Sequence, residues 1–424
     1  MPQQNGSPWW KRIGAGFITG AADDDPSGIA TYSQVGAAFG YGILWTVLLA
    51  LPLMIGIQAV CARVGRVTGA GLARNLRAEF PVPVVACAVV LLTIANVINL
   101  SADIGAIGAS TKLLVGGPAP LYAAVAALLS VALQVFVPMS RYTPILKLLA
   151  LSLLAYIATI FMIRVPWPHV LKQLVWPTLT MKVDYAVAIV AVLGTTISPY
   201  LFFWQSSEEA NEVRTDSQRE PLRNKPAHAD GAFRRIWMDT IGGMVFSEIV
   251  AFCIILAGAM VLHVHGKTDI RTSADAAMAL KPLAGKFAFL LFAGGIIGTG
   301  LLAIPVLAGS AAFALGETFR WRTGLERKPQ RAKLFYGAIA VATLGGMLLS
   351  FTPVNPIKML YWSAVTNGVV AVPMMVLIML LAGRRRIMGR FPIPDGLKVL
   401  GWAATGVMGA ATLVMFATAF LPHK

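Results

Sequence analysis

Long apolar runs separated by short polar stretches make up most of this chain. A helix needs about 20 apolar residues to cross the hydrocarbon core of a bilayer, and eleven segments approach or exceed that length. The pattern therefore predicts an all-α polytopic membrane protein with eleven transmembrane helices. The predicted spans are 13–41, 42–62, 83–112, 118–138, 144–163, 184–206, 236–262, 284–315, 334–352, 357–382 and 398–421.

The composition agrees with this assignment. Of the 424 residues, 57% are hydrophobic and only 13% are charged, whereas soluble domains carry about 25% charged residues. One domain, 1–424, embedded in the lipid bilayer is the simplest organisation. No cleavable signal peptide is evident. The three cysteines lie in apolar runs, which indicates packing rather than a disulfide framework.

The net charge of +16 is explained by membrane topology. Of the 35 Lys and Arg residues, 25 fall in the alternate loops that lie on the same side as the N-terminus. The positive-inside rule then places the N-terminus in the cytoplasm and the C-terminus outside the inner membrane. No nucleic-acid partner is needed to explain the charge. The most polar of these loops, 207–235, is expected to be a flexible cytoplasmic linker.

The first span is interrupted by acidic residues. Residues 20–28 read GAADDDPSG, which places Asp23, Asp24 and Asp25 between two apolar arms. Carboxylates at the membrane centre are costly and usually functional, and a spanning helix broken at such a point indicates an ion site in a transporter. The alternative is the start of a soluble helix, with Asp25 as N-cap and Pro26 as the first residue. That alternative leaves Asp23 and Asp24 unexplained.

The sixth span carries a second break at residues 194–200, which read GTTISPY. A proline inside an apolar span frees backbone carbonyls, and threonine and serine add hydroxyl oxygens. A proline kink would be the simpler explanation, but its pairing with the first break favours a site. Spans 13–163 and 184–382 then form two inverted repeats, each opening with a broken helix, and 398–421 is an additional eleventh helix.

Other polar residues lie inside the spans. Asn96, Asn99 and Asp103 share one helical face, where Asp103 could accept a proton or only take part in interhelical hydrogen bonding. Glu248 could relay protons, face a cavity or form a structural pair. Asn367 could contact the site or only pack. The chain contains no zinc-ligand spacing and no Walker A sequence, so we expect no cofactor and no direct ATP drive.

The two breaks resemble the signatures of the Nramp divalent-metal transporters. Residues 14–17, 25–31 and 40–41 read GAGF, DPSGIAT and GY, and the family's first span reads GPGF, DPGNFAT and FGY. Residues 194–200 are similar to the family's sixth-span GATVMPH. The detailed match is confined to spans one, two and six, and the likeness in layout extends over roughly 10–382. The resemblance implies a LeuT-like fold and uptake of divalent cations, usually coupled to protons.

The resemblance also implies roles for single residues. Asp25 occupies the position of the family's metal-binding aspartate, and carbonyls near Ala22 and Thr195 would complete the ligand set. Gly28 stands where the family has a ligand asparagine. Ser198 stands where the family has a ligand methionine, and its hydroxyl would be the remaining ligand. Asp23 and Asp24 would then lie beside these ligands or on the path to them.

Two further departures from the family concern protons. Tyr200 replaces a histidine that is associated with proton movement, and Ala106 replaces a glutamate of the third span. Asp103 matches an acid of the family's third-span proton route, but 334–352 contains no arginine to complete it. Proton coupling, passive transport and a different coupling are therefore all compatible with the sequence.

The replaced ligands predict a change in the preferred cation. A thioether favours soft transition metals, whereas carboxylate, carbonyl and hydroxyl oxygens suit Mg²⁺, Ca²⁺ or Mn²⁺. Gly28 is expected to leave the site roomier, and Asp23 and Asp24 add negative charge. We therefore expect a transporter of a divalent cation, which is Mg²⁺ on ligand hardness or Mn²⁺ or Fe²⁺ as is usual in the family. In these respects the chain resembles the Nramp-related magnesium transporters.

Two other functions are compatible with parts of the pattern. The helix that begins near Ser27 and Gly28 could bind the carboxylate of an amino acid or an organic ion, as in LeuT-like carriers, although three adjacent carboxylates disfavour an anion. An intramembrane enzyme could use Asp25 and Asp103 as an acid pair. No recognised motif supports that chemistry, so the chain is not expected to be an enzyme.

Overall fold

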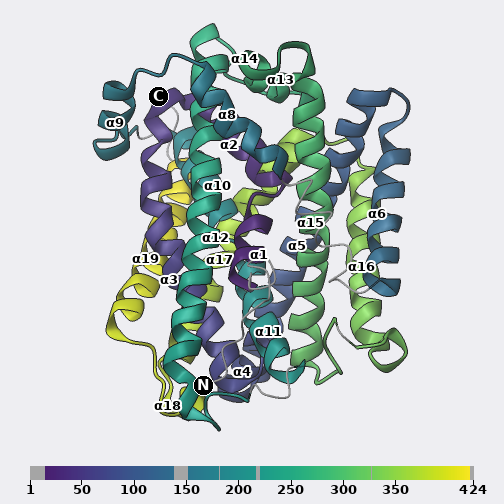
Figure 1. The fold of residues 1–424 in the computed structure, drawn as a ribbon, viewed down its shortest axis with the longest axis vertical. Helices are drawn as coiled ribbons and strands as arrows, with labels where there is room; N and C mark the ends of the chain where they lie inside the picture. The colour runs from purple at the N-terminus through teal and green to yellow at the C-terminus, as the bar shows by residue number, and fades with distance from the viewer. Residues whose placement is uncertain (1–14, 138–150, 181, 216–219, 326, 421–424) are drawn as a thin grey trace, which may run out of the picture.

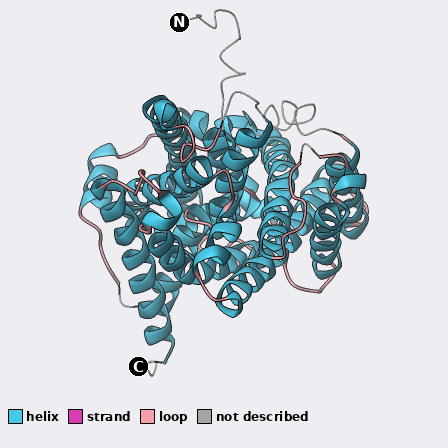
Figure 2. Ribbon diagram, turned by 90° about the horizontal axis from the view of Figure 1, so that it is seen from below, coloured by secondary structure: helices cyan, strands magenta, loops and turns pink. Residues whose placement is uncertain are grey.

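The structure is a computed structural model that describes residues 15–137, 151–180, 182–215, 220–325 and 327–420. Within these ranges the secondary structure is helical and no strand occurs (Figure 2). Nine helical segments of the described chain are long and apolar enough to cross a membrane. They are formed by α3 (Trp45–Thr68), α5 (Val82–Val115), α6 (Ala119–Phe136), α10 with α11 (Val183–Thr196 and Pro199–Thr215), α12 (Ala229–Ala257), α15 (Ala288–Thr318), α16 (Lys333–Ser350), α17 (Pro356–Ala382) and α19 (Asp395–Phe420).

The two remaining predicted spans are the first and the fifth. The first is divided into α1 (Ala15–Asp23) and α2 (Pro26–Phe39), each too short to cross a membrane alone. The fifth is described only in its second half, as α8 (Leu154–Met162), because 138–150 lies outside the described residues. The nine long segments and these two account for all eleven predicted helices.

Local backbone chemistry explains both breaks. Asp25 has an extended conformation, with φ −69° and ψ 173°, and its side chain caps α2 by accepting a hydrogen bond from the Gly28 amide. Pro26 follows as the first helical residue, where its missing N–H leaves no helical bond unmade. In the sixth span α10 ends at Thr196, and Pro199 begins α11 in the same way. The N-cap geometry that the soluble alternative required is therefore present, but at the centre of a membrane-spanning bundle.

The broken helices occupy the middle of the bundle. In Figure 1, α1 lies near the centre, with α12 across it and α5 and α15 to one side, while α3 and α19 form the opposite edge. Close packing holds α2 against α12, because a Cβ on Gly36 would lie 2.3 Å from the Ile255 carbonyl oxygen. The break residues Asp25 and Ser198 are each only 1% exposed.

Short helices cover the ends of the bundle. They are α4 (Leu72–Glu79), α9 (Trp167–Val175), α13 (Ser273–Ala277), α14 (Lys281–Ala284) and α18 (Arg385–Met388). A π-helical turn, Gly258–Leu262, and a 3-10 turn, His263–His265, extend α12 beyond its last α-helical residue.

The predicted flexible linker at 207–235 is wrong over much of its length. Helix α11 continues to Thr215, and α12 already begins at Ala229. Glu209 is 1% exposed and forms an ion pair with Arg235, 2.7 Å from atom to atom. Charge suggested a loop, but the charged side chains are paired between two helices, and the residues between them include the fully buried Leu222.

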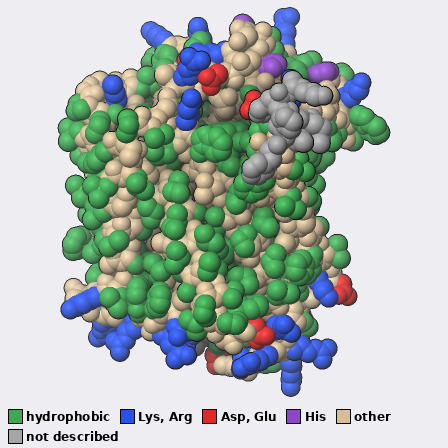
Figure 3. Space-filling model, turned by 180° about the vertical axis from the view of Figure 1, so that it is seen from behind, with side chains coloured by type: hydrophobic (Ala, Val, Ile, Leu, Met, Phe, Trp, Pro, Cys, Tyr) green, Lys and Arg blue, Asp and Glu red, His purple; other side chains and the backbone are tan. Residues whose placement is uncertain are grey.

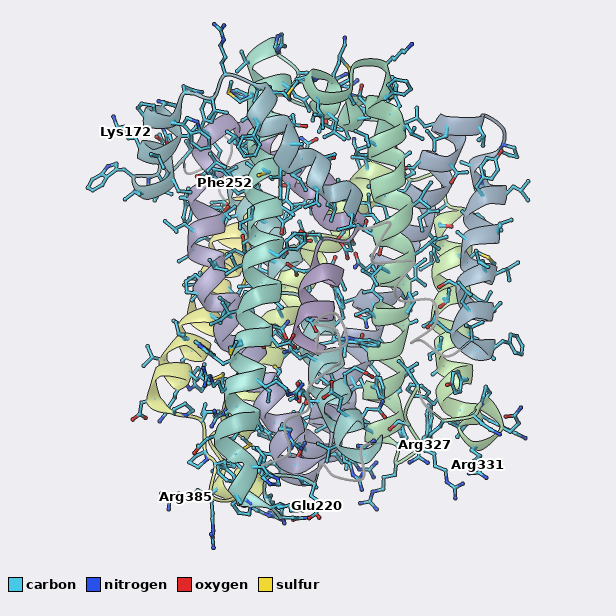
Figure 4. The ribbon with its side chains drawn as sticks, in the orientation of Figure 1. Lys172, Glu220, Phe252, Arg327, Arg331 and Arg385 are labelled. Atoms are coloured by element: carbon cyan, nitrogen blue, oxygen red, sulfur yellow. The ribbon has the colours of Figure 1, made fainter. Side chains whose placement is uncertain are left out.

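Charged side chains lie mainly at the two ends of the molecule and leave a hydrophobic band between them. Figure 3 shows a broad hydrophobic band with Lys and Arg gathered above and below it, most densely at the lower end. Figure 4 places Arg327, Arg331 and Arg385 at that lower end and Lys172 at the other. A hydrophobic band between charged ends is the surface expected of a multi-pass membrane protein.

The close approach of α2 to α12 gives a stability prediction. Gly36→Ala should destabilise the fold by about 1–3 kcal/mol, because the added methyl group meets the Ile255 backbone. A lower apparent melting temperature in detergent, followed by tryptophan fluorescence, would show this. Gly242→Ala is the matched control on α12, since no atom lies within 4 Å of its added Cβ. Equal melting temperatures for the two variants would contradict the packing argument.

Candidate functional site

The two breaks meet at the Asp25 carboxylate. Its Oδ1 accepts hydrogen bonds from the Ser27 hydroxyl at 2.5 Å and the Gly28 amide at 2.9 Å. Its Oδ2 accepts from Asn99 Nδ2 at 3.1 Å and from the Tyr200 hydroxyl at 3.2 Å. A carboxylate has about four lone-pair positions, so α2, α5 and α11 together satisfy this one. Asp25 therefore couples the first break to the second.

Two hydroxyl groups connect Asp25 to the other predicted ligands. The Tyr200 hydroxyl lies 3.2 Å from the Ala22 carbonyl oxygen as well as from Asp25. The Ser27 oxygen lies 3.4 Å from Thr195 Oγ1. The ends of α1, α2, α10 and α11 therefore share a continuous set of oxygen atoms.

Ser198 completes this set from the second break. Its hydroxyl lies 2.8 Å from both the Gly194 and the Thr195 carbonyl oxygens, which the end of α10 frees from helical bonding. One hydroxyl has one proton, so it can fully satisfy only one of the two carbonyls at a time. The other carbonyl and the lone pairs of Ser198 are oxygen donors that can bind a cation. The negative end of the α10 dipole lies at the same place.

The four predicted ligands Asp25, Ala22, Thr195 and Ser198 thus lie in one buried network. Their assignment as ligands is a hypothesis that rests on this proximity and on their oxygen chemistry. Among the described residues, no group of three or more His, Cys, Asp or Glu side chains is placed to hold a metal ion. A cation at this point would therefore be bound by one carboxylate together with carbonyl and hydroxyl oxygens.

Asp25 is also held by a hydrogen-bonded chain of residues from α5 and α17. Asn99 donates to Asp25 through Nδ2, and its Oδ1 accepts a hydrogen bond from the Ser363 hydroxyl at 2.7 Å. Asn96, one turn earlier, instead bonds to α15 through the Leu307 carbonyl at 3.0 Å. Sequence reasoning identified the polar face of this span but missed Ser363. Its spacing of four from Asn367 in an otherwise apolar span was the available signal.

Gly28, where the sequence predicts a roomier site, packs closely against its neighbours, and the size of the site stays a prediction. A Cβ at this position would lie 3.3 Å from the Asp23 carbonyl oxygen and 3.4 Å from both Thr195 Oγ1 and the Tyr32 ring. A Cβ here would therefore touch its neighbours, which shows that α2 and α10 lie close together at this position. Tyr32 of α2 also forms a 2.9 Å hydrogen bond with Thr196 of α10, which adds a second contact between these helices.

Asp23 and Asp24 contact α12. The Ser247 hydroxyl lies 2.7 Å from Asp23 Oδ2 and 3.2 Å from Asp24 Oδ1, so its single proton is shared between two carboxyl groups. Glu248 follows on the same helix with 4% exposure. The second oxygens of both aspartates and both oxygens of Glu248 have no hydrogen-bond partner among the described residues. This acidic group borders the Asp25 network on its α12 side.

Asp103 and Asn367 are buried without exposure, and none of their side-chain polar atoms has a hydrogen-bond partner in the described part of the chain. Asp103 does not donate to Asp25, whose four donors are those given above. The two aspartates therefore lack the shared hydrogen bond that an acid pair would use. The predicted contact of Asn367 with the ligands is not among the hydrogen bonds of the described chain.

Comparison with known proteins agrees with this geometry. The sequence model of the family described as "Natural resistance-associated macrophage protein-like", Nramp, matches residues 16–418. A protein of Pectobacterium carotovorum named divalent metal cation transporter MntH is 27% identical over 388 residues, covering 89% of this chain and 87% of its own. The MntH of Ralstonia nicotianae is also 27% identical, over 96% of this chain and 91% of its own.

Solved structures show the same fold. The manganese transporter of Eremococcus coleocola, crystallised with an aromatic bis-isothiourea compound, superimposes with a TM-score of 0.72 at 18% identity over 99% of this chain and 88% of its own. The nucleobase-cation-symport-1 family transporter Mhp1 superimposes with a TM-score of 0.56 at 15% identity, covering 96% of this chain and 92% of its own. The fold is LeuT-like, with a five-plus-five inverted repeat and broken helices one and six. By its sequence over nearly its whole length and by its fold, the chain belongs to the Nramp family.

Proposed function

We propose that this chain is a secondary transporter that moves a divalent metal cation across the inner membrane by alternating access. The observation that carries the proposal is the network in which Asp25, at the first break, meets oxygens of the second break. Membership of the Nramp family supports it, since two relatives bear the name divalent metal cation transporter. A membrane carrier of this kind is not an enzyme.

The proposed ligands are all oxygens. Asp25 supplies the charge, Ala22 and Thr195 supply carbonyls, and Ser198 supplies its hydroxyl. Such a hard ligand set favours Mg²⁺, which keeps several of its bound water molecules. We therefore propose Mg²⁺ as the preferred transported cation, ahead of Mn²⁺ and Fe²⁺. The bound cation is the transported substrate, so no resident cofactor is invoked.

The repeat boundaries follow from the two breaks. We propose that 13–163 and 184–382 are the two repeats and that 398–421 stands outside them. The greater density of Lys and Arg at the lower end in Figure 3 supports a cytoplasmic location for that end. We propose that the N-terminus is cytoplasmic and that the C-terminus is outside.

Replacing the charged ligand tests the proposed function. Asp25→Asn keeps the size of the side chain but removes its charge, so cation affinity should fall by about a hundredfold or more, as expected for loss of one partner from a buried charge pair. Isothermal titration of the purified protein with Mg²⁺ and, separately, Mn²⁺ measures this.

Asp230→Asn, an exposed substitution at the start of α12, is the matched control and should bind like the wild type. Wild-type protein that binds neither cation would overturn the metal proposal and favour a carrier of an amino acid or organic ion. Unchanged binding by Asp25→Asn would overturn the ligand assignment.

The hardness argument gives a second prediction. Ser198→Met adds a soft thioether, so the affinity for Mn²⁺ and Cd²⁺ should rise relative to that for Mg²⁺. Competition between these ions in the same titration measures the ratio. Ser198→Leu is the control of similar volume without sulfur, and it should weaken binding of every cation alike. An identical ion preference in the Met and Leu variants would contradict a ligand role at this position.

Asp103 is our candidate for proton coupling. It is fully buried, without a hydrogen-bond partner in the described chain, and one turn along α5 from Asn99, which contacts Asp25. Glu248, Asp23, Asp24 and Tyr200 are further groups close enough to the site to affect proton movement. An unpartnered buried carboxyl group is costly to keep charged, which makes it suited to taking up and releasing a proton.

Proteoliposomes that contain a trapped pH indicator test this coupling. Cation uptake by the wild type should acidify the lumen. Asp103→Asn should abolish the acidification while isothermal titration still detects cation binding. Asp184→Asn, at the end of α10 remote from the break, should behave like the wild type. Cation uptake without acidification in the wild type would overturn proton coupling but leave the cation proposal intact.

A further inference from the structure

A largely apolar groove opens at the lower end of the bundle, away from the ion site. It lies between the end of α3, the start of α12 and the start of α19, with a cavity volume of about 750 Å³. That volume lies within the roughly 300–1,000 Å³ range of ligand pockets. Its walls include Leu397 and Leu400 of α19 and Ile236 and Trp237 of α12.

Arg63 lines this groove and forms no ion pair with a carboxylate in the part of the chain that the structure describes. The Arg63 guanidinium carbon lies 3.6 Å from the centre of the Phe233 ring, and Phe233 in turn makes an edge-on contact with Phe391. The buried Nε of Arg63 has no hydrogen-bond partner among the described residues. The ring stack therefore holds a cation in place without neutralising its charge.

A second arginine lines the same groove. Arg234 is exposed and forms no ion pair with any described residue. Its neighbour Arg235 is fully engaged, with ion pairs to Glu209 at 2.7 Å and Glu212 at 3.2 Å. The groove therefore combines an apolar channel with two guanidinium groups that have no carboxylate partner among the described residues.

The position of the groove relates it to the lipid surface. Trp237 is 39% exposed beside it, and indole rings concentrate where membrane and water meet. The groove begins at the end of the molecule where Arg385 and other basic residues gather (Figure 4). An occupant would have an apolar body along the helices and an anionic head at the membrane surface.

We infer that this groove binds an anionic phospholipid. The phosphate would lie between Arg63 and Arg234, and an acyl chain would run along α19 between Leu397 and Leu400. Basic pockets between transmembrane helices are suited to anionic headgroups, and guanidinium groups suit phosphate oxygens. The bound lipid would hold α19, the helix outside the proposed repeats, against α3 and α12. This inference is independent of which cation is transported.

Native mass spectrometry of delipidated protein tests the inference, with phosphatidylglycerol and phosphatidylcholine added in turn. The wild type should retain phosphatidylglycerol in preference to phosphatidylcholine, and its melting temperature should rise with the anionic lipid alone. The double variant Arg63→Gln/Arg234→Gln should retain it roughly thirtyfold less well, because two basic contacts with the headgroup are lost. Arg385→Gln/Arg386→Gln, two exposed changes on α18 outside the groove, should behave like the wild type.

A second variant separates the apolar channel from the charges. Gly396 lines the groove, and no atom lies within 4 Å of a Cβ added there. Gly396→Trp should fill the channel and exclude the lipid without disturbing the fold. Gly406→Trp is the matched control on the same helix, since it too adds a side chain into open space but lies outside the groove.

The outcomes are distinct. Equal retention of the two lipids, or retention of phosphatidylglycerol by Gly396→Trp, would overturn the inference. Stabilisation by inorganic phosphate equal to that by the lipid would identify a site for a soluble anion instead and would also overturn it. Cation titration of the same variants should match the wild type, so failure of the lipid inference and failure of the transport proposal can be told apart.

Discussion

A helix that is broken inside a membrane exposes backbone groups where no water can satisfy them, and this constraint governs the centre of the molecule. Each unsatisfied group costs several kcal/mol in hydrocarbon. Asp25 resolves the problem for α2 by capping its first turn through the Gly28 amide. The Asp25 carboxylate that caps the helix also needs hydrogen-bond donors for its remaining lone pairs. Three other residues donate hydrogen bonds to it.

The rest of the bundle is arranged so that those donors can reach Asp25. Asn99 is presented by α5 and held by Ser363 of α17, while Tyr200 comes from the first turn of α11. Ser198 plays the matching part at the end of α10, where it bonds to the freed carbonyls. The scaffold helices therefore position the groups that make two helix breaks tolerable in the membrane. Two of the proposed ligands, Asp25 and Ser198, are among the groups that satisfy these breaks.

Much of this arrangement could be predicted from the sequence because its causes are local. Acidic residues, proline and glycine in an apolar run predict a break, and both breaks are found where the pattern placed them. Contacts between distant segments could not be predicted in this way. The role of Ser363 becomes apparent only in the structure, where α17 lies beside α5 and Ser363 bonds to Asn99. The charges of 207–215 suggest a loop, but in the structure Glu209 pairs with Arg235 of a neighbouring helix.

The surroundings of Gly28 are a second feature that the sequence alone could not predict. In a sequence, a glycine in place of a larger residue suggests a larger cavity. Neighbouring helices can pack more closely at a glycine and reduce that cavity. Here a Cβ at Gly28 would lie 3.3 Å from the Asp23 carbonyl oxygen and 3.4 Å from the Thr195 hydroxyl, so α2 and α10 lie close together. The family resemblance suggested the oxygen ligands, which stay a hypothesis, whereas the size of the site depends on packing between helices that the sequence does not specify.

The Tyr200 hydroxyl bridges the Ala22 carbonyl and Asp25, and under the proposed ligand assignment it would make cation binding an exchange reaction. An ion that contacts both oxygens must displace this phenol, so its net affinity is the difference between two sets of interactions. The returning hydroxyl competes with the ion for the same oxygens and thereby assists release. Under the proposed ligand assignment, weaker binding of the cation would therefore be accompanied by easier release.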